Sequence, residues 1–136
     1  MQLVPYLHFE GNAEDALNFY KDALGGEITM LSRYKDSPMP VDEDYKEKVI
    51  HARLKFGDNL IMISDTFKGN KTSTGGNIQM SLEVDDENKM EEVFSKLAEG
   101  GKVTMPLQKQ FWGAKFGMLT DKFGTGWMLN HEGKND

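Results

Sequence analysis

This chain of 136 residues carries one strand-and-helix pattern twice, and the duplication constrains its fold more than any other feature. In the first copy, apolar residues at three- and four-residue steps predict a helix over Ala13–Leu24, which two glycines beginning at Gly25 end. In the second copy the same spacing predicts a helix over Glu87–Leu97, and two glycines beginning at Gly100 follow it. One predicted strand precedes each helix, and three predicted strands come after it.

The strands bound the two copies. They are expected at residues 4–9, 27–34, 49–56 and 60–65, and again at 77–84, 102–107, 115–121 and 126–131. Asn12 is suited to cap the first helix, and the turn Asp85-Asp86 supplies a capping residue for the second. A polar, glycine-rich linker covers 67–76. The sequence therefore predicts a single domain over 1–136, made of two modules at approximately 1–66 and 77–136.

One helix can cover only one face of the sheet in its own module. The other face stays open unless a second module completes it. Two such modules together predict an α+β fold with a curved, mostly antiparallel sheet around a cavity. A cavity of this kind is where a small ligand would bind.

Composition excludes several classes of protein. Hydrophobic residues make up 38% of the chain and charged residues 28%, which is typical of a globular protein. No apolar run approaches the roughly 18 residues of a membrane span. The net charge is −6 and no basic cluster is present, which argues against nucleic acid as a partner. Cysteine is absent, and the first residues show no signal-peptide pattern, so we expect a cytoplasmic protein.

Several segments resemble a known family. They are residues 4–7, 11–16, 50–52 and 61–65, the tryptophan-containing stretch 111–124, and residues 127–130. Together they are similar to PhnB-like proteins of the vicinal-oxygen-chelate superfamily, the glyoxalase and bleomycin-resistance group. The resemblance spans nearly the whole chain, and the tryptophan-containing stretch is its most specific part. It implies the duplicated fold described above, a homodimer, and a branch without a settled activity.

The resemblance also implies where a metal would lie. In metal-dependent relatives such as glyoxalase I, the four ligands come from the first and last strands of each module. These positions correspond here to Pro5, Met62, Gln79 and Met128. Proline has no side-chain donor, thioethers suit zinc, nickel and magnesium poorly, and one amide cannot hold a cation. We therefore expect neither a metal nor another cofactor.

Strand alternation predicts the residues that line the cavity, because side chains two positions apart share a face. His51 and Arg53 lie on the open side of their strand, and His8 is expected on the helix side of the first strand. Trp112 is a candidate lid or stacking partner for the ligand, with packing in the core or a dimer interface as the alternative. The remaining candidates are Leu7, Phe9, Met62, Ser64, Gln79, Glu83, Met128 and Asn130.

Three functions are compatible with this cavity. The first is metal-free binding of a small organic molecule, in which Arg53 can hold a carboxylate or phosphate. The second is a lyase- or isomerase-type enzyme in which His51, assisted by Glu83 or Arg53, moves a proton on a small anionic substrate. The third is a glyoxalase- or dioxygenase-like enzyme with a displaced metal site near these two residues. His51 can instead have a structural or dimer-contact role, Arg53 can be a solvated charge, and Glu83 can form a salt bridge.

Overall fold

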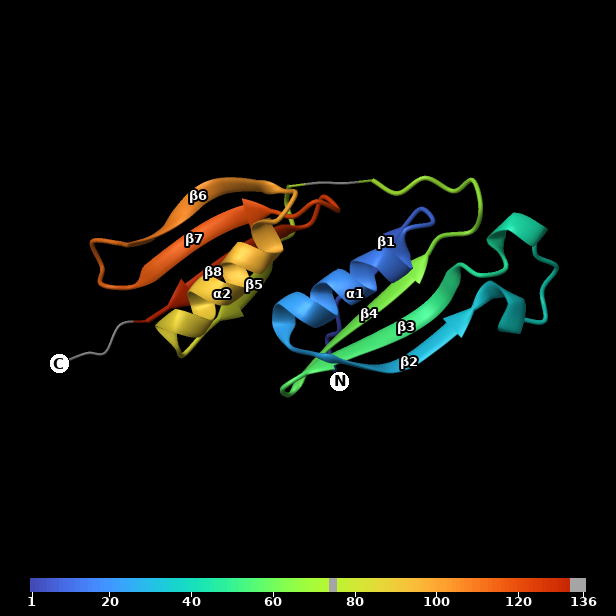
Figure 1. The fold of residues 1–136 in the computed structure, drawn as a ribbon, viewed down its shortest axis with the longest axis horizontal. Coiled ribbons are helices and arrows are strands. Elements are labelled where there is room, and N and C mark those ends of the chain that lie inside the picture. The colour runs from blue at the N-terminus through green and yellow to red at the C-terminus, as the bar shows by residue number, and fades with distance from the viewer. Residues whose placement is uncertain (74–75, 133–136) are drawn as a thin grey trace. The chain divides into compact units, whose positions relative to one another are not determined.

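The computed structural model describes residues 1–73 and 76–132. The chain divides into two compact units, Met1–Ser73 and Thr74–Asp136. The first unit contains β1 (Tyr6–Phe9), α1 (Ala13–Leu24), β2 (Glu27–Arg33), β3 (Val49–Phe56) and β4 (Asn59–Asp65), with short 3₁₀ turns at Tyr34–Asp36 and Glu43–Tyr45 (Figure 1). The second contains β5 (Met80–Glu83), α2 (Glu87–Ala98), β6 (Lys102–Lys109), β7 (Lys115–Thr120) and β8 (Gly126–His131).

The two units share one topology. The strand order is β1-β4-β3-β2 in the first sheet and β5-β8-β7-β6 in the second. The first and last strands of each unit pair in parallel, and the other neighbours pair in antiparallel. The predicted α+β fold with two strand-helix-strand-strand-strand modules is thus confirmed. The shared cavity and the single-domain organisation stay predictions.

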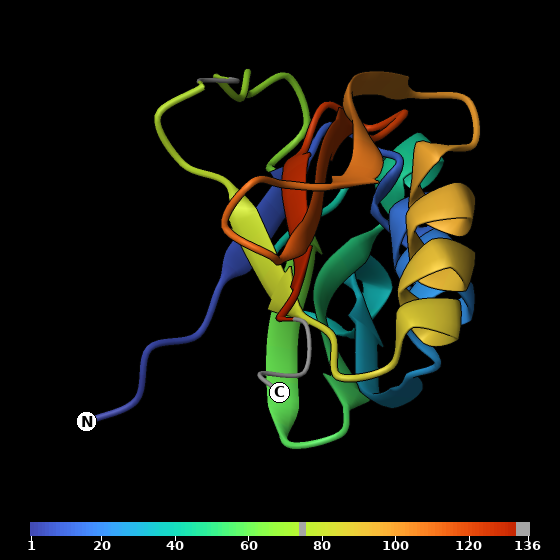
Figure 2. The same ribbon diagram turned by 90° about the vertical axis from the view of Figure 1, so that its left-hand side faces the viewer.

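Each helix covers one face of its own sheet, and α2 is seen on one side of its strands in Figure 2. Under α1 the sheet contributes Leu54, Ile61 and Ile63, and under α2 it contributes Leu119, Trp127 and Leu129, all of which are buried. The helix residues that pack against them are Ala16, Leu17 and Tyr20 in the first unit and Met90, Val93 and Leu97 in the second. The amphipathic spacing therefore identified the core-facing stripe of both helices correctly. Among the described residues, no helix is long and apolar enough to span a membrane.

The glycine pair at the end of each helix has two separate roles. The first member adopts a left-handed conformation that ends the helix, with φ of 69° at Gly25 and 73° at Gly100. The second member lets the chain pass close to the neighbouring strand. A Cβ atom on Gly101 would collide with the backbone of Thr120 and Asp121.

The carboxylate of Asp65, at the end of β4, connects three parts of the first unit. It is 1% exposed and accepts hydrogen bonds from the backbone N–H groups of Gly11 (2.8 Å), Ala13 (2.9 Å) and Val49 (3.0 Å). It therefore takes the place of an N-cap for α1. The predicted cap at Asn12 was wrong, because its side chain makes no capping hydrogen bond and Asp65 already bonds the first N–H group of the helix.

The second helix is capped as the sequence predicts. The side chain of Asp86 accepts from the backbone N–H groups of Asn88 (2.8 Å) and Lys89 (3.1 Å). A local cap of this kind is encoded within three residues. The Asp65 cap joins positions far apart in the chain, so local sequence patterns do not reveal it.

We expect Asp65→Ala to lower the free energy of unfolding by about 3 kcal/mol, because three buried N–H groups lose a charged acceptor. The measurement is urea denaturation followed by circular dichroism. Asp58→Ala is the matched control, because Asp58 lies exposed in the turn between β3 and β4. Equal midpoints for the two variants would contradict the role assigned to Asp65.

Candidate functional site

The face of the first sheet opposite α1 carries a row of side chains that crosses all four strands. The strand register places Tyr6 beside Met62, Met62 beside Arg53, and Arg53 beside Met30. His8 and His51 project from the same face, since each lies two residues from a member of the row. We call this set the open face; its members are Tyr6, His8, Met30, His51, Arg53 and Met62.

Hydrogen bonds join three members of the open face into a chain. The Tyr6 hydroxyl lies 2.8 Å from Nδ1 of His51, and Nε of Arg53 donates to Nε2 of His51 at 3.2 Å. The Tyr6 ring stacks on His8 with centroids 4.5 Å apart, and it meets the His51 ring edge-on at 5.6 Å. Both nitrogens of the His51 ring therefore have a partner.

Charge on the open face differs from that of the chain as a whole. The pKa of His51 is lowered, first by its partial burial and second by the positive charge of Arg53, so the uncharged imidazole is favoured near neutral pH. Arg53 is exposed and takes part in none of the ion pairs among the described residues. An available cation thus lies between two methionines in a chain of net charge −6.

The structure corrects the predicted faces of β1. Leu7 pairs with Ile63 and Phe9 pairs with Asp65, so both point to the α1 side, and Phe9 is only 6% exposed. The prediction that they line the open side with Met62 was therefore wrong, as was the prediction that His8 faces the helix. The cause is the parallel register, which sets Tyr6, not Pro5, beside Met62.

Tyr6 is the member of this site that sequence reasoning missed. The sequence feature that could have identified Tyr6 is its spacing of two residues from His8, because residues at this spacing place their rings on one face of a strand. Ser64 was a candidate, and its hydroxyl donates to the carbonyl of Asp65 at 2.9 Å while the residue is buried. The Ser64 hydroxyl hydrogen is thus bonded to the backbone at the end of β4 and does not point to a ligand.

The candidates of the second unit share a face, as predicted. Ser81 pairs with Met128, and Glu83 pairs with Asn130, whose side-chain nitrogen donates to the Glu83 carboxylate at 2.9 Å. The side chain of Gln79 lies against Gly126. A Cβ atom built on Gly126 would be 3.3 Å from Cγ of Gln79. A salt bridge from Glu83 to a cation was the alternative expectation. The structure instead gives Glu83 the side-chain amide of Asn130 as its partner.

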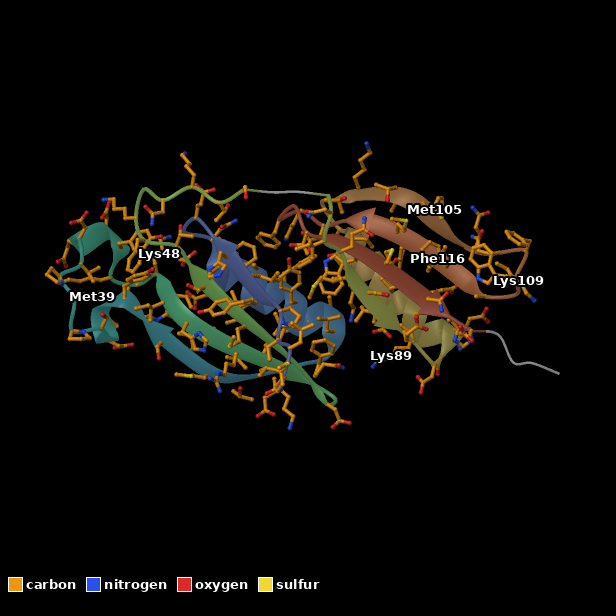
Figure 3. All side chains as sticks on the ribbon, turned by 180° about the vertical axis from the view of Figure 1, so that it is seen from behind. Met39, Lys48, Lys89, Met105, Lys109 and Phe116 are labelled. Carbon is orange, nitrogen blue, oxygen red and sulfur yellow. The ribbon has the colours of Figure 1, made fainter. Side chains whose placement is uncertain are left out.

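Strand β7 extends this second face. Met118 pairs with Met128 and Phe116 with Asn130, while Met105 on β6 pairs with Met118. Met105 and Phe116 are labelled in Figure 3, which views the second sheet from the side away from α2. Methionine is thus abundant on the open side of both sheets.

Trp112 lies in the loop between β6 and β7. It is 57% exposed, and its ring meets that of Phe111 edge-on with centroids 4.9 Å apart. This position places it outside the core, so the core-packing alternative was wrong. Its role as a lid or stacking partner stays a prediction.

Comparison with known proteins identifies the family. The model described as the Glyoxalase/Bleomycin resistance protein/Dioxygenase superfamily matches residues 2–129. The chain belongs to this superfamily. It is 31% identical over 140 residues to Protein YjdN of Escherichia coli strain K12, covering 96% of this chain and 95% of that protein.

Two solved structures are similar to this chain over nearly its whole length. Protein PA1353 from Pseudomonas aeruginosa is 43% identical, with a TM-score of 0.87 and coverage of 97% of this chain and 98% of that one. A Bacillus cereus PhnB protein, described as a putative 3-demethylubiquinone-9 3-methyltransferase, is 32% identical, with a TM-score of 0.82 and coverage of 96% and 99%. The predicted resemblance to PhnB-like proteins is confirmed.

The superfamily includes metal-dependent enzymes, so the donor set must be tested against a cation. In the first unit Met62 offers a thioether, and Tyr6, which stands beside it in place of Pro5, directs its hydroxyl to His51. In the second unit Met128 and Gln79 offer a thioether and an amide. Within residues 1–73 and 76–132, no three histidines or carboxylates gather where they could hold a metal ion. This donor set does not fit a hard divalent cation, and we derive no metal-dependent step.

We expect the stability of the wild-type protein to fall more steeply below pH 6.5 than that of His51→Gln. The folded protein holds the pKa of His51 below its ordinary value, so the unfolded chain binds more protons in this window. The contribution of neutral His51 to the free energy of unfolding is therefore complete above about pH 6.5. It is lost as the pH falls through the lowered pKa of His51. Urea midpoints between about pH 7.5 and 5 would measure this, and parallel curves would refute it.

Proposed function

We propose that the protein binds a small organic anion on the open face of the first sheet. The single observation that carries this proposal is Arg53, an exposed cation with no carboxylate partner among the described residues, in a chain that is acidic overall. The Nε–H group of Arg53 donates to His51, and the two terminal nitrogens of Arg53 remain available to a carboxylate. A fixed guanidinium of this kind favours bidentate pairing with a planar anion.

The neighbours of Arg53 favour a ligand with an apolar body. Met30 and Met62 flank it on the adjacent strands, and Met30 is 43% exposed. Methionine side chains adapt their shape to different apolar surfaces. The stacked rings of Tyr6 and His8 add a flat surface that suits a planar group. An aromatic carboxylate combines these properties, and benzoate is the simplest probe.

Residues of the second unit enter the proposal as predictions. Gln79, Met128, Asn130 and Trp112 would complete a cavity shared by both modules. A homodimer and a cytoplasmic location likewise stay predictions.

The alternative is an enzyme that uses His51 as an acid or base. The lowered pKa of His51 favours this role, because it keeps the imidazole uncharged near neutral pH. The contact with Arg53 opposes it, because the Nε2 lone pair already accepts a hydrogen bond. Assistance from Glu83, which lies in the other unit, stays a prediction. Binding is therefore the function that the geometry supports best.

We expect Arg53→Met to weaken benzoate binding about tenfold, as the loss of one charge-assisted hydrogen bond would do. Isothermal titration calorimetry measures the dissociation constant. Lys55→Met is the matched control, because Lys55 lies two residues along the same strand and stands opposite Glu27. The wild type should prefer benzoate to uncharged benzamide, and benzamide to cationic benzylamine. Equal binding of benzoate and benzylamine, or equal losses in the two variants, would overturn the proposal.

A further inference from the structure

We infer that Arg53 fixes the order of protons in the Tyr6–His51 pair, so that the Tyr6 hydroxyl donates its hydrogen outward to an acceptor on the bound molecule. This inference rests on the proposed function and deepens it. It makes Tyr6 a ligand-contacting residue and His51 a positioning residue, and it selects ligands with a carbonyl or carboxylate oxygen.

The guanidinium of Arg53 carries only donors and stays protonated. Its Nε–H group points to Nε2 of His51 at 3.2 Å. A protonated Nε2 would place two N–H groups against each other, and a ring protonated on both nitrogens would also place two positive charges side by side. Nε2 must therefore be the unprotonated nitrogen that accepts this hydrogen bond.

An uncharged imidazole carries one N–H group, and with Nε2 unprotonated that group is at Nδ1. Nδ1 lies 2.8 Å from the Tyr6 hydroxyl oxygen, so it donates and the oxygen accepts. Burial and the charge of Arg53 both lower the pKa of His51, in keeping with the uncharged ring.

The direction of the Tyr6 hydroxyl follows from this order. Its oxygen accepts from His51, so its own hydrogen cannot point at the same nitrogen. Tyr6 is 38% exposed, and His51 is the hydrogen-bond partner of its hydroxyl among the described residues. The hydrogen is thus available on the open face, and Tyr6 and Arg53 bond different nitrogens of the one imidazole ring.

A ligand on this face has two kinds of donor available to it. The Tyr6 hydroxyl supplies a neutral donor, and Arg53 supplies charged ones. A carboxylate or carbonyl oxygen accepts from either donor, whereas a protonated amine accepts from neither. The opposite proton order would turn the Tyr6 hydrogen toward His51 and leave the ligand facing a lone pair.

The test that needs no ligand is long-range ¹H–¹⁵N correlation NMR of protein labelled at histidine, recorded at about pH 7.5. His51 is assigned by comparison with His51→Gln. We expect protonated Nδ1 and unprotonated Nε2 in the wild type and in Tyr6→Phe. Arg53→Met should move the proton to Nε2, whereas Lys55→Met should leave it at Nδ1. A wild-type proton on Nε2, or no change in Arg53→Met, would overturn the inference.

Binding of benzamide then tests the donor itself, because this probe has an oxygen acceptor and no charge. We expect Tyr6→Phe to weaken benzamide binding about fivefold, as the loss of a neutral hydrogen bond would do. Unchanged benzamide affinity in Tyr6→Phe would overturn the role of Tyr6. A wild type with the expected Nδ1 proton that binds neither benzamide nor benzoate would support the proton order and contradict the proposed function.

Discussion

The buried carboxylate of Asp65 is the interaction on which the rest of the first unit depends. It bonds the turn between β1 and α1, the first residue of the helix and the start of β3, while its own strand lies between β1 and β3. The Tyr34 hydroxyl also donates to the Asp65 carbonyl at 2.8 Å. A buried charge with three backbone donors is satisfied in a way that a shifted strand could not reproduce. Asp65 therefore fixes the register of β4 against its neighbours.

The open face depends on that register. Tyr6 comes from β1, Met62 from β4, and Arg53 from β3, and a shift of one residue in any strand would turn its side chains to the helix side. The buried and the open side of the sheet are thus set together. The positions that fill the core under α1 alternate with those that carry the hydrogen-bonded chain. Stability and the candidate site share one alignment of strands.

Much of the fold was predictable because it is encoded locally. The helix over Ala13–Leu24 follows from its apolar stripe and its terminal glycine, and the open side of β3 follows from alternation around His51 and Arg53. The faces of β1 were not predictable in this way. Its four residues, Tyr6–Phe9, are all aromatic or apolar except one histidine, so they show no alternation. The hydrogen bond between Tyr6 and His51 joins residues 45 positions apart and depends on a parallel register that no local pattern encodes.

The pairing of the first strand of each unit with its last strand has a consequence for biosynthesis. The ribosome delivers β1 first, yet the strand that bonds it is β4, the final one of the unit. Until Asp65 emerges, the N–H groups of Gly11 and Ala13 lack their acceptor. The helix and the antiparallel pair of β2 and β3 can form before β4 emerges, but the sheet closes only when β4 pairs with both β3 and β1. Translation therefore completes each unit at its last strand, and a chain halted before that point exposes an unpaired β1.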